Sequence, residues 1–160
     1  MKAWSRRALF CGLAYTALSI FITSGKAMVK YFSVYATTLL VMVILDLIWL
    51  GVIAKPLYQQ GIGHLMADKP NVVVAVIFYA VFAMGLTVFA VVQPGAGWPK
   101  TWLMAALFGF CAYATYDLTN LATLKQWPIA LSLIDMAWGT LVSVVSASAG
   151  KAVWIRLDMS

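Results

Sequence analysis

Residues 72–92, VVVAVIFYAVFAMGLTVFAVV, form an uninterrupted apolar segment that ends at Gln93, Pro94 and Gly95. A helix needs about 20 apolar residues to cross the hydrocarbon core of a bilayer, because each residue adds about 1.5 Å. A buried strand is the other structure that an apolar run can form, but strands are usually much shorter than this segment. Residues 72–92 therefore predict a transmembrane helix.

Three further segments have the same character: residues 31–54, 101–124 and 129–149. Each is bounded by charge, Pro or Gly, as helix ends commonly are. Four tryptophans fall at the predicted ends, namely Trp98, Trp102, Trp127 and Trp154. Amphipathic indole rings favour the membrane interface. We therefore expect an all-α fold, a polytopic membrane bundle with four core transmembrane helices.

The composition agrees with a membrane protein. Of 160 residues, 64% are hydrophobic and 10% are charged, whereas a soluble domain carries about 25% charged residues. The net charge is +6, but Lys and Arg occur in ones and twos between the apolar segments. This is the distribution of charges at membrane edges, and it argues against a nucleic-acid partner. The length allows a single domain.

Cysteine and histidine provide no sign of a metal centre. Cys11 and Cys111 lie in separate apolar segments without a CxxC motif, and His64 is the single histidine. Metal and haem sites usually need several such residues at characteristic spacings. We therefore expect no metal and no cofactor.

Residues 1–27 differ from the rest of the chain. Lys2, Arg6 and Arg7 precede a short apolar stretch over residues 8–22, in the layout of a signal peptide but without a clean cleavage site. The segment could be a cleaved leader, the product of a misassigned start codon, or a retained and loosely packed short fifth helix.

The division of the chain that we expect is therefore residues 1–27 as leader or extra helix and residues 28–160 as the four-helix transmembrane domain. The distribution of Lys and Arg favours cytoplasmic termini if the chain starts at Met28. The same rule favours the opposite orientation if residues 1–27 form a fifth helix.

Three carboxylates lie inside the predicted helices: Asp46, Asp117 and Asp135. A charged side chain near the centre of a bilayer costs at least about 2.5 kcal/mol. Counted from the predicted helix ends, all three lie about 9–12 Å below the same membrane face. In a compact bundle they can converge on one polar site.

The surrounding residue types suit a binding site. Tyr and Asn side chains at helical spacing from the acids would orient them by hydrogen bonding, and two tryptophans would form walls able to hold an organic cation. The histidine lies in the loop of residues 55–71, which opens on the same face. The candidate ligand- or proton-binding residues are Asp46, Asp117, Asp135, Asn120, Tyr113, Tyr116, Trp49, Trp138 and His64.

Carboxyl groups that share an apolar site cannot all ionise cheaply, since burial and like charge both disfavour the charged form. We expect at least one of the three to be protonated at neutral pH and the set to titrate as a coupled group. A purely structural role is the alternative, because polar side chains between membrane helices stabilise packing by about 0.6 kcal/mol each.

Small residues recur at four-residue spacing in the last two predicted helices. They are Ala105, Gly109, Gly139, Ser143 and Ala147. Such spacing lets helix backbones approach closely in lipid. We interpret these residues as a packing seam.

Four motifs occur in order: DLIWLG at 46–51, HLMADKP at 64–70, YATYDLTNLATL at 113–124 and DMAWG at 135–139. Together they resemble the bacterial membrane protein family catalogued as domain of unknown function 2177. The resemblance implies a small four-helix, multi-pass protein of the inner membrane, whose relatives begin close to Met28. It implies no particular activity.

Three functions are compatible with these observations. The first is a transporter or ligand-binding protein with a proton- or cation-responsive carboxylate cluster. The second is a membrane enzyme acting on lipid or quinone, although the absence of a nucleophile motif and of a glycine-rich phosphate loop argues against an enzyme. The third is an accessory protein that binds a partner in the bilayer. The expected partners are the bilayer itself, a second copy of the chain, and a small organic cation or lipid.

Overall fold

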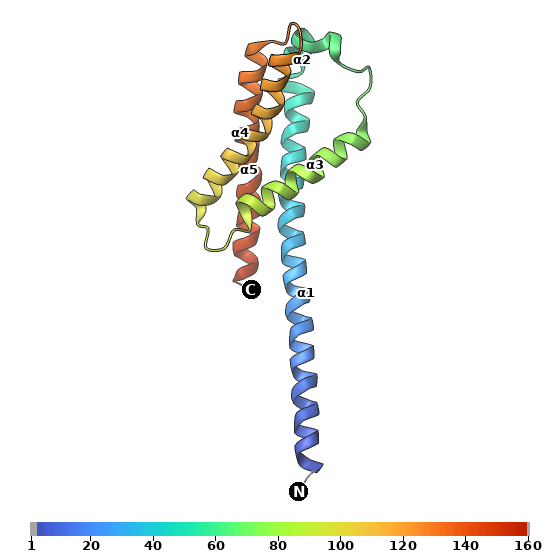
Figure 1. Ribbon diagram of the computed structural model, residues 1–160, viewed down its shortest axis with the longest axis vertical. Helices are drawn as coiled ribbons and strands as arrows, with labels where there is room; N and C mark the ends of the chain where they lie inside the picture. The colour runs from blue at the N-terminus through green and yellow to red at the C-terminus, as the bar shows by residue number, and fades with distance from the viewer. Residues whose placement is uncertain (1–2, 160) are drawn as a thin grey trace.

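The computed structural model describes the backbone of residues 3–159 and the side chains of residues 25–159. Within the described backbone the protein is helical and contains no strand. Figure 1 shows the arrangement of the helices. In chain order they are α1 (Ala3–Ile48), the π-helical turn η1 (Trp49–Ile53), α2 (Lys55–Ile62), the 3-10 turn η2 (Gly63–Leu65), α3 (Val72–Leu86), the π-helical turn η3 (Thr87–Val91), α4 (Trp98–Thr123) and α5 (Ile129–Asp158).

Local sequence explains where the helices begin. The Asn71 side chain accepts a hydrogen bond from the Val74 amide at 3.2 Å and caps the first turn of α3. Proline stands in the first turn of both α2 and α4, where its missing N–H leaves no intrahelical bond unmade. The chain between α4 and α5 reverses through Gln126, which has a φ of 62°.

Among the described residues, three helices are long and apolar enough to cross a membrane. They are Gly25–Ile53, Val72–Val91 and Ile129–Asp158. The remaining predicted span, residues 101–124, corresponds to α4, which has 26 residues but a lower mean hydropathy than the other three helices. Its second half carries the polar sequence around Asp117, which lowers the average. The prediction of an all-helical membrane protein is confirmed. Three of the four expected membrane spans are found among the described residues.

Residues 1–27 were expected as a cleaved leader, the product of a misassigned start codon or a short extra helix, and these alternatives remain predictions. The backbone runs without a turn from Ala3 into the first span, as one α-helix of 46 residues. Gly25 does not interrupt it, since one glycine within a helix costs only about 1 kcal/mol. Figure 1 shows this part of α1 extending well beyond the other helices. Residues 1 and 2 lie outside the described residues.

Helix α5 is the centre of the bundle, because it packs against α4, α1 and η3. Close approach between α4 and α5 depends on glycine. A Cβ added at Gly109 would lie 2.3 Å from the carbonyl oxygen of Gly139, and one added at Gly139 would lie 2.2 Å from the ring of Tyr113. The predicted packing seam of small residues is therefore confirmed.

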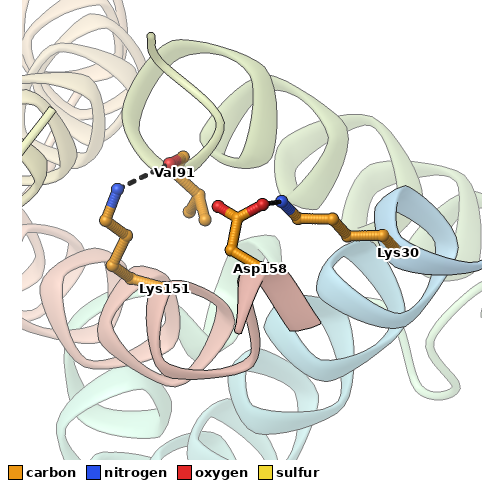
Figure 2. Close-up of polar contacts among 4 residues, drawn as sticks. All are labelled: Lys30, Val91, Lys151 and Asp158. Carbon is orange, nitrogen blue, oxygen red and sulfur yellow. Dashed lines mark hydrogen bonds and ion pairs between the residues drawn. The ribbon is translucent and has the colours of Figure 1, made fainter. Parts of the chain in front are cut away.

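Charged side chains hold together the end of the bundle at which α5 terminates (Figure 2). Lys30 of α1 forms an ion pair with Asp158 of α5, and its Nζ lies 3.4 Å from the ring centroid of Trp154. Buried Lys151 donates hydrogen bonds to the carbonyl oxygens of Ala96, at 2.7 Å, and of Val91, at 3.5 Å. These bonds satisfy backbone acceptors where η3 ends and the chain turns toward α4.

Candidate carboxylate site

A cavity of about 410 Å³ lies at the other end of the bundle, among α1, α2, α3, α4 and α5. Its walls are mostly aromatic, and two of the three intramembrane acids line it. The lining residues are Asp46, Trp49, Leu50, Tyr58, Phe78, Tyr79, Phe82, Ala112, Tyr113, Tyr116, Asp135 and Trp138.

Asp46 reaches the cavity from α1 and is only 3% exposed. Its Oδ1 accepts a hydrogen bond from the indole Nε1 of Trp138 on α5, at 2.7 Å. The Tyr79 hydroxyl of α3 also interacts with this carboxyl. Three helices therefore meet at one acid, and the acid has hydrogen-bonding partners without a basic residue.

Asp135 reaches the same cavity from α5 and is 2% exposed. Its Oδ1 accepts a hydrogen bond from the hydroxyl of Tyr58. Tyr58 belongs to α2, the short helix that follows the first span after buried Ala54. The chain thus turns back at the end of the first span and places a tyrosine over an acid of the last one.

Trp49 and Trp138 stack on one another, with ring centroids 4.3 Å apart and an angle of 5° between the planes. Both rings line the cavity, where they form one stacked pair. The Nε1 of Trp49 is buried and makes no hydrogen bond of normal geometry, although the Tyr58 hydroxyl lies near it.

Asp117 takes a different position. It is fully buried on α4 but does not line the cavity. Ser132 of α5 lies beside it, yet neither carboxyl oxygen makes a hydrogen bond of normal geometry. The Ser132 hydroxyl accepts from the indole of Trp127 at 2.9 Å. Asp117 therefore lies outside the cavity lining, beside Ser132 and its partner Trp127.

Asp135 acts electrostatically on both Asp46 and Asp117. Within residues 25–159, no three acidic, histidine or cysteine side chains lie close enough together to hold a metal ion. The acids are thus near enough to influence one another without forming a chelating group.

Some of the remaining predicted site residues line the cavity and others do not. Tyr113 and Tyr116 line the cavity, as do both tryptophans. Asn120 interacts with the Tyr116 hydroxyl but does not line the cavity. His64 is exposed on η2 and lies apart from the cavity lining.

Sequence reasoning did not select Tyr58 or Tyr79 as site residues. Tyr79 has the single polar side chain within α3, and this signal could have identified it. The sequence places residues 55–71, which include Tyr58, at the same face as the acids, but the hydrogen bond from Tyr58 to Asp135 required the structure.

Buried carboxyls among aromatic rings, inside a bundle of apolar helices, define a helical membrane protein with a polar site in its interior. The chain belongs to the family of predicted membrane proteins DUF2177, which matches residues 31–152. The match confirms the resemblance drawn from the four sequence motifs. Comparison with curated proteins and with solved structures gave no match.

Proposed function

We propose that this protein binds a cationic ligand within the bilayer and that the ligand competes with protons for Asp46 and Asp135. One observation carries the proposal: the cavity holds two buried carboxyls, and none of its described lining side chains is positively charged. A pair of carboxylates in such a place is costly when both are ionised. A proton or a cation relieves that cost.

The aromatic lining favours an organic cation over a hydrated metal ion. Ammonium groups are attracted to the faces of tryptophan and tyrosine rings, by up to about 2 kcal/mol when desolvated. The Trp49–Trp138 stack offers an outer face beside the acids. Oxygen-rich sites for hard metal ions instead supply many carboxylates, carbonyls and waters.

A site at which protons and cations exclude one another supports transport as well as binding. The proposal therefore extends to a proton-coupled transporter in a bacterial inner membrane, with both acids as the exchanging groups. It includes α4 as a fourth span, because 26 residues of α-helix extend about 39 Å. The glycine contact with α5 also supports α4 as part of the same membrane bundle.

Calorimetric titration of the protein in lipid nanodiscs with benzyltrimethylammonium tests the proposal. We expect binding that strengthens as pH rises and releases protons, because cation and proton compete. Asp46→Asn and Asp135→Asn should each weaken binding by roughly tenfold or more, which corresponds to about 1.4 kcal/mol. Asp68→Asn is the matched control, since Asp68 lies in the exposed loop before α3. Unchanged affinity in both cavity variants, with correct folding shown by gel filtration, would contradict the proposal.

A further inference from the structure

A second and larger space adjoins the carboxylate cavity. It is a groove of about 820 Å³ between α1 and α3, closed at one end by α2. Most of its lining is aliphatic, and several of these side chains are exposed on the surface of the bundle. The groove is lined by Leu39, Val43, Leu47, Leu50, Gly51, Lys55, Tyr58, Gln59, Met66, Pro70, Val72, Ala75, Val76, Tyr79 and Ala80.

The groove and the cavity share part of their lining. Leu50, Tyr58 and Tyr79 line both of them. Tyr58 is central, because its ring borders the groove while its hydroxyl donates to Asp135 in the cavity. Rotation of this one side chain would open a path from the groove to the acid.

Charge is distributed unevenly along the groove. Lys55 is its one described basic side chain, and it lies at the α2 end together with Gln59. Lys55, Tyr58 and Gln59 share a face of α2 by i, i+3 and i+4 spacing. The remainder, from Leu50 down to Leu39, is apolar over about 16 Å of helix. The groove thus has a cationic and polar head region and an apolar tail region.

We propose that the groove binds a zwitterionic, amine-bearing phospholipid as the ligand of the carboxylate site. Its acyl chain lies between α1 and α3, its phosphate meets Lys55, and its ammonium passes Tyr58 toward Asp135. This assignment rests on the proposed function and names the ligand class. An anionic lipid could pair with Lys55, but it has no cationic group for the acids. A simple fatty amine could pair with the acids, but it has no anionic group for Lys55.

Photolabelling of the full chain in nanodiscs tests the assignment. The probe is phosphatidylethanolamine with a diazirine on its acyl chain, and the comparison probe is phosphatidylglycerol with the same chain. Peptide mass spectrometry then identifies the labelled residues. We expect the ethanolamine probe to label the groove residues Val43, Ala75 and Val76 well above the lipid-facing residues Val73 and Ile77. Unlabelled phosphatidylethanolamine should suppress the groove labelling.

Two variants with matched controls sharpen the result. Ala75→Phe fills the groove, while Val73→Phe places the same ring on the exposed face of α3. Lys55→Gln removes the phosphate partner, while Lys69→Gln removes an exposed loop charge. Groove labelling should fall in Ala75→Phe and Lys55→Gln and persist in the two controls. The wild-type labelling pattern remains decisive even if Ala75→Phe folds poorly.

The outcomes separate the two proposals. Equal labelling of groove and lipid-facing residues, or equal groove labelling by the two probes, overturns the phospholipid assignment. The proposed function then stands if benzyltrimethylammonium still binds in an Asp46-dependent manner. Absence of that small-cation binding in the wild-type protein overturns the proposed function itself.

Discussion

Asp46 illustrates how this chain accommodates an acid within a bundle. The Trp138 indole donates to it, and the same indole is fixed in place by its stack on Trp49. Both tryptophans follow an acid by three residues in the sequence, at 46 and 49 and at 135 and 138. Trp138 of α5 donates to the acid of α1, whereas Asp135 accepts from Tyr58 and not from Trp49.

At the residue scale we predict that Trp138→Phe destabilises the protein by about 1–3 kcal/mol, because a buried carboxyl loses its donor. The ring of phenylalanine retains part of the stack on Trp49. Unfolding in mixed detergent micelles measures the change.

Trp102→Phe is the control for this prediction. Its Nε1 donates to Ser148 at 3.1 Å, but Trp102 is largely exposed, so its loss should cost less. Equal destabilisation by the two substitutions would show that the hydrogen bond to Asp46 contributes no more to stability than the hydrogen bond to Ser148.

The candidate site could be predicted from the sequence only in part. The cost of an acid in lipid identified all three aspartates, and helical rise placed them at one depth. Helix rotation about its own axis is not fixed by these arguments. For that reason the structure places Asp46 and Asp135 in one cavity and turns Asp117 toward Ser132.

At the scale of the element, the close contact between α4 and α5 can be tested by substitution at Gly109. Gly109→Ala would bring a Cβ to 2.3 Å from the Gly139 carbonyl oxygen, which belongs to the backbone and cannot rotate away. We predict a loss of about 1–3 kcal/mol from overpacking. Thermal unfolding in detergent measures it.

Gly63→Ala is the control for the helix contact, since an added Cβ there meets nothing within 4 Å. Its effect should remain within about 0.5 kcal/mol, as for most surface substitutions. A similar loss in the two variants would mean that general glycine effects, and not the α4–α5 contact, determine stability.

Lys151 and Asp158 of α5 allow a second prediction, which compares how much each side chain contributes to stability. Lys151→Met should cost about 1–3 kcal/mol, because two backbone carbonyls lose their donor. Asp158→Asn should cost less than about 1 kcal/mol, since its side chain is 58% exposed and exposed ion pairs contribute little. Chemical unfolding of both variants provides the comparison, and the reverse order would contradict it.

The sequence predicted the positions of the long helices along the chain better than it predicted how these helices are connected. The predicted segment of residues 72–92 corresponds closely to α3 and η3, because apolar length alone defines a span. Helix α2 was not predicted, since the short segment from Lys55 to Ile62 has no long apolar period. The sequence also did not predict that one helix, α1, runs from Ala3 to Ile48, because charged and polar residues near residue 27 resemble a helix boundary.

At the scale of the whole molecule, the two ends of the bundle differ in their buried charged groups, which are Lys151 at one end and Asp46 and Asp135 toward the other. Lysine side chains lie at the end where α5 terminates, and carboxyls with tyrosine partners lie toward the end covered by α2. The groove between α1 and α3 leads from the α2 end into the apolar body. A ligand entering from the bilayer would therefore reach the acids without crossing the lysine end.

Four membrane crossings are a prediction for the molecule as a whole. In a Cys11→Ser, Cys111→Ser background, Lys100→Cys and Gln126→Cys should react with a membrane-impermeant maleimide from opposite sides of the membrane. Lys100 lies in the first turn of α4 and Gln126 lies just beyond its last residue, Thr123, so opposite accessibility requires that α4 crosses the membrane. If both positions react from the same side, α4 does not cross the membrane.

The central claim is that Asp46 and Asp135 share a site at which protons and cations compete, and dicyclohexylcarbodiimide tests it most directly. This reagent modifies protonated carboxyls in apolar surroundings, and peptide mass spectrometry identifies the modified residue. We predict modification of Asp46 or Asp135 that persists above about pH 7 and is suppressed by benzyltrimethylammonium. Loss of modification near the ordinary carboxyl range, or modification that the cation does not affect, would contradict the claim.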